Sequence, residues 1–220
     1  MSDIGYGDFE FERKFLVRDL PAEVRAEHDP VLIVQSYFLA SEGYALRVRV
    51  QAPATALDGG AAVDLGPGLD LAAVLERITP QISFCGLTAK GPEVAGTRYE
   101  AERELDAGVG VEMIRRGGRP IVKYRHSLWL GTDGWAIDAF LGQNAPLIIA
   151  ECERGGPVTD LVIPEFCVTE VTDDPRFTND ALSARPFAQW SAEIERELAT
   201  RGPRFLNDFG RNQLPGGTPG

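Results

Sequence analysis

The chain has 220 residues, of which 44% are hydrophobic and 25% are charged, as expected for one globular domain, or one domain with an appendage. Its net charge of −11 argues against binding to a nucleic-acid polymer, because a phosphate backbone requires a basic face. No apolar run approaches the roughly 20 residues that cross a bilayer, so we expect no membrane partner.

The N-terminal part of the chain is predicted to contain three strands and a short helix. Residues 9–15 alternate large apolar with charged side chains, which is typical of a strand with two different faces. Residues 19–29 indicate a short helix, and residues 31–40 and 44–50 indicate two strands joined by a turn. Residues 51–68 are rich in Ala, Gly and Pro, have no periodicity and predict a loop.

Strands dominate from residue 82 to about residue 172, after a helix predicted at residues 69–78. Turn signals separate these strands, and a short helix is predicted among them at residues 106–118. The strands are expected at residues 82–90, 97–106, 120–130, 134–142, 146–154 and 167–171. Many short strands with turns between them predict an antiparallel barrel or sandwich.

The C-terminal region divides into a helix and a tail. Residues 187–200 place Phe187, Trp190, Ile194 and Leu198 on one helical face, which we expect to pack on the main domain. The predicted organisation is therefore a domain over residues 1–186, a packed helix over residues 187–201 and a flexible tail over residues 202–220.

Charged side chains recur at every second position of six predicted strands and therefore share one face within each strand. They are Glu10, Glu12 and Lys14; Arg47 and Arg49; Arg98, Glu100, Glu102 and Glu104; Lys123 and Arg125; Asp138; and Glu151 and Glu153. Each set could belong to a solvated face of a sheet. We favour the alternative of a closed barrel with a polar lumen, because acidic and basic pairs lie on different strands. Charges inside a lumen would be costly unless they were paired or ligated, and a metal-bound polyanion would supply that compensation.

The chemistry of these side chains favours a phosphate ligand with a cation. Carboxylate oxygens suit Mg²⁺ or Mn²⁺, whereas Arg and Lys suit phosphate oxygens. The sequence contains no Gly-x-x-x-x-Gly-Lys-Ser/Thr motif, so a P-loop is excluded.

The residues from Glu10 to Lys14 resemble the Glu-x-Glu-x-Lys signature of the CYTH superfamily, also called the triphosphate tunnel metalloenzymes. Further matching residues follow in family order, and residues 168–182 are similar to the family's strand and following helix start. The ordered residues are Arg47 and Arg49, Lys90, Glu100 and Glu102, Lys123 and Arg125, Asp138, and Glu151 and Glu153. The resemblance runs from about residue 8 to residue 186.

This resemblance implies a mainly β (α+β) fold: an eight-stranded antiparallel β-barrel with a charged tunnel and peripheral helices. It also implies a Mg²⁺- or Mn²⁺-dependent hydrolase acting on a phosphoanhydride of inorganic triphosphate or a small organic triphosphate. Two alternatives stay open. One is a non-catalytic module that binds triphosphate or polyphosphate. The other is a class IV type adenylate cyclase, which is less favoured because nothing in the sequence requires an adenine pocket.

The resemblance assigns roles to the charged residues by position. It implies metal binding by Glu10, Glu12, Glu100, Glu102, Asp138, Glu151 and Glu153. It implies substrate binding by Lys14, Arg47, Arg49, Lys90, Arg98, Arg119, Lys123 and Arg125. The catalytic set is Glu10, Glu12, Lys14 and Glu153. An arginine before the Lys123–Arg125 pair is also expected, and the sequence does not choose among Arg115, Arg116 and Arg119.

The remaining polar residues are expected to be structural. The odd number and wide spacing of Cys85, Cys152 and Cys167 fit buried thiols in a reducing compartment better than a disulfide framework. His126 has the parity opposite to its charged neighbours and is expected to be a structural histidine. The acidic N-terminus lacks the apolar core of a signal peptide, so we expect a cytoplasmic protein, either a monomer or a homodimer.

Overall fold

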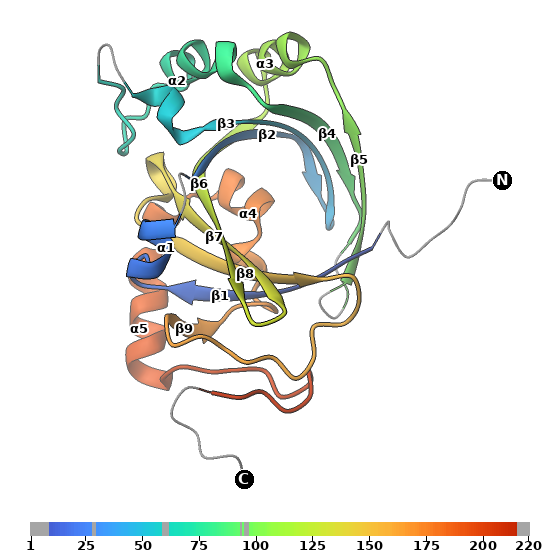
Figure 1. Ribbon diagram of the computed structural model, residues 1–220, viewed down its shortest axis with the longest axis vertical. Coiled ribbons are helices and arrows are strands. Elements are labelled where there is room, and N and C mark those ends of the chain that lie inside the picture. Colours follow the sequence, from blue (N-terminus) through green and yellow to red (C-terminus); the bar gives the residue numbers. More distant parts are fainter. Residues whose placement is uncertain (1–8, 28–29, 59–61, 93, 95–96, 215–220) are drawn as a thin grey trace, which may run out of the picture.

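Eight antiparallel strands close into a barrel, as predicted. The computed structural model describes residues 9–27, 30–58, 62–92, 94 and 97–214. Around the barrel the strand order is β5-β4-β3-β2-β6-β7-β8-β1, and β1 pairs again with β5 to close it (Figure 1). The strands are β1 Phe9–Val17, β2 Val31–Ser41, β3 Tyr44–Pro53, β4 Phe84–Lys90, β5 Thr97–Glu104, β6 Arg119–Leu130, β7 Asp133–Phe140 and β8 Ile148–Arg154. Since the barrel closes, the charged faces of its strands can surround one lumen.

Strand β1 forms the seam of the barrel. Its first residues pair with β5, with Glu10 opposite Arg98. Its length pairs with β8, with Glu12 opposite Glu153. On the edge that pairs with β5 at its start, the last residues of β1 pair with the short strand β9 Cys167–Glu170. Strand β9 extends the sheet outside the barrel. The seam therefore brings acidic residues from three strands to one side of the lumen.

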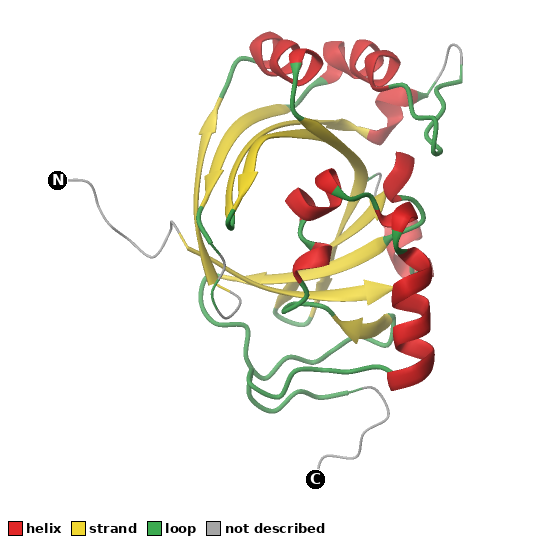
Figure 2. Cartoon of the chain, turned by 180° about the vertical axis from the view of Figure 1, so that it is seen from behind, coloured by secondary structure: helices red, strands yellow, loops and turns green. Residues whose placement is uncertain are grey.

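Helices α1, α2 and α3 cover the apolar outer face of the barrel, whereas the start of α4 lines the lumen (Figures 1 and 2). The helices are α1 Ala22–Glu27, α2 Leu71–Ile78, α3 Ala107–Arg116, α4 Asn179–Ala184 and α5 Ser191–Arg201. Helices α2 and α3 share a core with outward-facing residues of β2, β3 and β4, such as Val48 and Val50. Helix α3 packs so closely that a Cβ at Gly110 would lie 2.1 Å from Cys85 Sγ, so only glycine fits there.

The predicted helix at residues 187–200 is divided into two parts. A 3₁₀ turn spans Phe187–Gln189, and α5 begins at Ser191. Phe187, Trp190 and Ile194 are buried in one cluster with apolar residues of β1, β6 and β8. The apolar face identified in the sequence therefore packs against the barrel.

Residues 202–214, which we expected to belong to a flexible tail, run along the outer side of β1 and β9 (Figure 2). The reason is a buried ion pair. Arg13 points out of the barrel and donates to both carboxylate oxygens of Glu170 at 2.8 and 2.7 Å, and both side chains are fully buried. The backbone N–H of Leu206 donates to Glu170, the side chain of Asn212 accepts from Arg13, and the ring of Phe209 lies 4.9 Å from the guanidinium carbon. This segment thus shields the ion pair from water.

Other expectations are met or fall partly outside the described residues. All three cysteines are buried and free, as expected. In the region predicted to be a loop, β3 extends to Pro53 and a 3₁₀ turn follows at Ala54–Leu57; residues 59–61 lie outside the described part of the chain. Among the described helices, none is long and apolar enough to cross a membrane.

Candidate active site in the barrel lumen

The lumen contains a cavity of about 780 Å³. Most of the predicted site residues line it because their alternate positions place them on the inner face of each strand. Those that do are Glu10, Glu12, Lys14, Arg47, Arg49, Lys90, Arg98, Glu100, Lys123, Arg125, Glu151 and Glu153. The side chains therefore occupy a shared space rather than separate solvated faces.

The wall formed by β1 and β8 is acidic. Glu12 and Glu153 are directly opposite each other across these strands, so their carboxylates repel. Partial burial, together with the nearby Glu10, Glu12 and Glu151, raises the pKa of Glu153 to about 6. Burial and the charges of Asp138 and Glu12 also raise the pKa of Glu151. This wall has excess negative charge, which is the environment that a cation would stabilise.

The opposite part of the lumen is basic. Arg47 is almost fully buried and donates to Thr88 at 3.0 Å and to Glu100 at 3.3 Å, while Arg49 donates to Glu102 at 2.9 Å. Among the described side chains, the Nε atoms of Arg47 and Arg49 are buried without a hydrogen-bond partner. Buried donors are normally satisfied, so these two N–H groups remain available to a ligand in the lumen.

Asp138 of β7 lies beside the basic residues of β6 and pairs with Arg125 across the two strands. Its carboxylate is fully buried and accepts from Lys123 and, through two bonds of 2.7 Å, from Arg125. Burial opposes ionisation of Asp138, but Arg125 and Lys123 outweigh it and hold the pKa of this carboxyl well below its usual range. Burial lowers the pKa of Lys123 to about 8 despite the neighbouring Asp138. Arg125 also donates to Glu151 at 2.9 Å and so connects the basic residues to the acidic wall.

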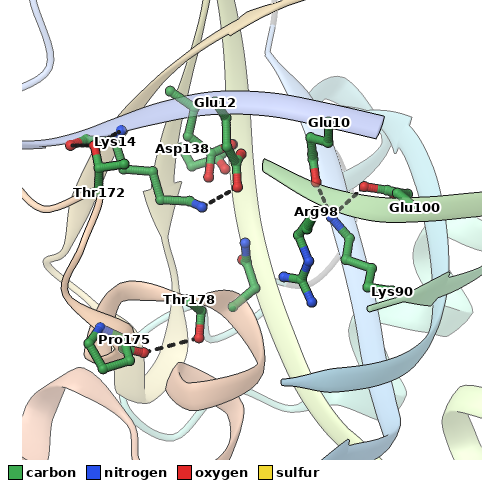
Figure 3. A network of polar contacts seen from close by, with 12 residues as sticks. Glu10, Glu12, Lys14, Lys90, Arg98, Glu100, Asp138, Thr172, Pro175 and Thr178 are labelled. Atoms are coloured by element: carbon green, nitrogen blue, oxygen red, sulfur yellow. Dashed lines mark hydrogen bonds and ion pairs between the residues drawn. The ribbon is translucent and has the colours of Figure 1, made fainter. Parts of the chain in front are cut away.

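Lys90 connects three strands at the seam (Figure 3). Its Nζ lies 2.8 Å from Glu10 on β1 and 2.5 Å from Glu100 on β5. Burial would raise the pKa of Glu100, but Lys90 and Arg47 lower it on balance. Lys14 makes a similar contact with Glu12 on the same strand. Both lysines thus reach the lumen with an acidic partner beside them.

Some of the predicted site residues are placed differently. Arg98 lines the cavity, but its guanidinium donates to the backbone carbonyls of Gly91, at 2.9 Å, and Gly43, at 3.2 Å, so it fastens two turns together. Arg119 has the parity of Lys123 but is exposed where β6 begins. Arg115 and Arg116 pair with Glu112 on the surface of α3. In the described part of the chain, the cavity lining contains none of these last three arginines.

The lumen also contains residues that charge patterning did not identify. Gln35 and Tyr37 of β2 are buried there, and Gln35 donates to the Tyr37 hydroxyl at 3.3 Å. Gln35 and Tyr37 are two residues apart and therefore share one face of the strand, which the sequence could have shown. The apolar residues around them, however, make this strand resemble one that is buried on both faces. At the start of α4, the Asn179 side chain accepts from Lys123 at 3.1 Å, a contact between segments 56 residues apart.

The carboxylates of the acidic wall are suitable donors for a divalent cation. Among the described residues, no three Asp, Glu, His or Cys side chains lie close enough to hold a metal ion as they stand. The charges of Glu10 and Glu12 nevertheless affect Glu153, and long glutamate side chains on neighbouring paired strands can converge. An all-carboxylate set with room for water fits Mg²⁺ or Mn²⁺.

Part of the chain is similar to known proteins. No protein-family model matches the chain. Over 103 residues, the chain is 33% identical to an inorganic triphosphatase of Acetivibrio thermocellus, and the match covers 46% of this chain and 66% of that relative. A crystal structure of an inorganic triphosphatase shares 24% identity, with coverage of 79% of this chain and 93% of its own and a TM-score of 0.49. A Hippeastrum protein, described as a putative adenylyl cyclase that reveals a dominant triphosphatase activity, shares 16% identity over 66% of this chain and 79% of its own, with a TM-score of 0.38. The closed eight-stranded barrel, with its ordered acidic and basic pairs facing one cavity, has the architecture that the resemblance to the CYTH superfamily predicts.

Proposed function

We propose that the protein is a divalent-metal-dependent triphosphatase that hydrolyses the terminal phosphoanhydride of inorganic triphosphate. The observation that supports this most strongly is the division of the lumen into an acidic wall and a basic region with two unsatisfied arginine Nε atoms. A cation at the acidic wall and a polyphosphate among the basic residues would compensate both. The identity to the Acetivibrio inorganic triphosphatase favours the same substrate.

The cation is assigned to Glu10, Glu12 and Glu153, which lie on the neighbouring paired strands β1 and β8. When bound, a divalent cation would neutralise charge on the transferring phosphoryl group and lower the pKa of a bound water. Glu151 lies beside this set, and its raised pKa makes it the carboxylate best suited to accept the proton of the attacking water.

The phosphate chain is assigned to the basic residues that line the cavity: Lys14, Arg47, Arg49, Lys90, Lys123 and Arg125. Arginine can bind two phosphate oxygens through its fork of N–H groups, and lysine acts as a compact positive charge. Because phosphoryl transfer passes through a loose transition state, positioning and charge neutralisation supply most of the catalysis. A tunnel of fixed charges provides both.

Asp138 and Glu102 are assigned a positioning role instead of metal ligation. Asp138 already accepts hydrogen bonds from Lys123 and Arg125, which are the residues proposed to hold phosphate. Glu102 accepts from Arg49 and from Thr88, which in turn accepts from Arg47. Both acids thus fix the direction of the basic side chains.

The direct test is phosphate release by the purified full chain. With inorganic triphosphate and Mg²⁺ or Mn²⁺, we expect turnover that a chelator abolishes. If neither metal supports orthophosphate release from any triphosphate tested, the enzymatic proposal is refuted. Cyclic AMP formed from ATP without orthophosphate would instead indicate a cyclase.

Metal affinity should depend on pH in a defined direction. Glu153, with a raised pKa of about 6, carries a proton at lower pH, and a cation must displace that proton. We expect the Kd for Mn²⁺ to rise about tenfold between about pH 7 and about pH 5 and to change little above about pH 7. Without metal, the same raised pKa favours the folded state increasingly as the pH falls from about 6 toward the ordinary glutamate value.

Electron paramagnetic resonance of free Mn²⁺ measures this affinity directly. The Glu153→Gln variant is the control: it should bind Mn²⁺ more weakly and show a much flatter pH dependence. A wild-type affinity that stays constant from about pH 5 to about pH 7 would contradict the assignment of Glu153.

A further inference from the structure

The inner face of β6 changes character along its length. Lys123 and Arg125 lie in the charged part of the lumen, and the next two positions on the same face are Ser127 and Trp129. All four residues line the same cavity. The cavity wall therefore passes from cationic to neutral and aromatic toward the end of β6.

The neighbouring strand β7 changes in the same direction. Asp138 faces Arg125, whereas Ala136 faces Ser127 and Gly134 faces Trp129. Ala136 and Gly134 also line the cavity. On the other side of β7, Glu151 of β8 pairs with Ala136, and Glu153 follows it on the same face. The neutral mouth is therefore formed by β6 and β7 and is bordered by the acidic wall.

The indole of Trp129 lies against the backbone of Gly134. A Cβ at Gly134 would be 3.4 to 3.6 Å from three atoms of the six-membered ring, so the glycine gives the indole a flat support. Trp129 is nevertheless 73% exposed, so most of its surface is open to solvent. A supported aromatic face beside a polar cavity is suited to stacking on a planar ring.

The spacing fits a ligand that reaches both parts of the cavity. Four residues of strand separate Arg125 from Trp129, which corresponds to about 13 Å. The cavity of about 780 Å³ lies within the range of roughly 300–1,000 Å³ that is usual for pockets of organic ligands. A triphosphate among the basic residues would leave the neutral mouth for a group attached to its end.

We propose that Trp129 is a specificity-determining residue that stacks on the planar ring of an organic triphosphate of the nucleotide type, while the phosphate chain occupies the charged site. This inference rests on the proposed triphosphatase function and extends its substrate class. Water attacks the terminal phosphorus, the bond to the bridging oxygen breaks, and the products are the organic diphosphate and orthophosphate. Inorganic triphosphate is held without help from Trp129.

The test compares Trp129→Ala with wild type on two substrates, ATP and inorganic triphosphate, each with Mg²⁺. Loss of one stacking partner should lower kcat/KM for ATP about tenfold, mainly through KM, and change kcat/KM for inorganic triphosphate less than about twofold. Trp129→Phe should recover most of the ATP activity. Tyr44→Ala is the matched control, since Tyr44 is a 53% exposed aromatic at the β2–β3 turn and should affect neither substrate.

A binding measurement separates this inference from the proposed function. ATP should quench the tryptophan fluorescence of wild type but not of Trp129→Ala, because the other two tryptophans, Trp135 and Trp190, are buried. Inorganic triphosphate has no ring to stack on Trp129 and should quench neither protein. Hydrolysis of inorganic triphosphate with no effect of Trp129→Ala on ATP would overturn the inference and leave the proposed function intact. ATP quenching at Trp129 without hydrolysis of either substrate would overturn the function and retain the subsite. Equal losses with both substrates would make Trp129 a structural or partner-contact residue.

Discussion

Glu153→Gln is expected to lower kcat with inorganic triphosphate by about 100-fold or more without weakening the fold. The substitution removes a carboxylate assigned to the cation, and loss of a direct metal ligand should cost at least as much as loss of an outer-shell partner. The same change removes a negative charge that Glu10, Glu12 and Glu151 disfavour, as the raised pKa of Glu153 indicates. The metal-free variant should therefore unfold at the same temperature as wild type or slightly above it.

This combination of lost activity and retained stability distinguishes a binding site from a structural charge. The two measurements are phosphate release, with metal present, and thermal unfolding, without metal. Glu195→Gln is the control, because Glu195 forms an exposed pair with Arg18 and should change neither quantity. Full activity in Glu153→Gln would remove Glu153 from the site, and a large loss of stability would make it a structural residue.

Arg13→Met is expected to destabilise the protein by about 3–5 kcal/mol, because it leaves Glu170 buried and charged without its partner. For a chain of this size the melting temperature should fall by roughly 10 °C. The double variant Arg13→Met with Glu170→Leu should be less destabilised than the sum of the two single variants, since no unpaired buried charge remains.

The matched control for the buried pair is the exposed pair of Arg18 and Glu195, whose side chains are 54% and 55% exposed. Arg18→Met should change the free energy of unfolding by less than about 1 kcal/mol. Thermal or denaturant unfolding measures both variants. An Arg13→Met variant as stable as Arg18→Met would contradict the role assigned to the C-terminal segment that covers the pair.

The inner faces of the strands could be predicted from the sequence because strand parity is a local property. Alternation places Glu12 and Glu153 on the charged faces of their strands, and the register puts them opposite each other. Parity could not show where a long side chain ends. Arg98 has the correct parity, yet its guanidinium binds the carbonyls of Gly91 and Gly43, which are brought close only by the fold.

The C-terminal tail shows a second limit of sequence reasoning. Residues 202–214 have little periodicity and resemble a flexible segment, but their contacts depend on Arg13 and Glu170, which are distant in sequence. Arg13 shares the parity of the buried Phe15 on β1 and points out of the barrel. The acidic partner that makes its burial tolerable could not be identified without the pairing of β1 with β9.

The central claim is that the charged lumen performs hydrolysis as well as binding, and ³¹P NMR of the wild-type protein with inorganic triphosphate and Mg²⁺ tests it most directly. We predict that the triphosphate signals disappear with time and that pyrophosphate and orthophosphate form in equal amounts. A chelator should stop the reaction. Triphosphate signals that broaden on binding but keep their total intensity would contradict the claim and make the protein a triphosphate-binding module.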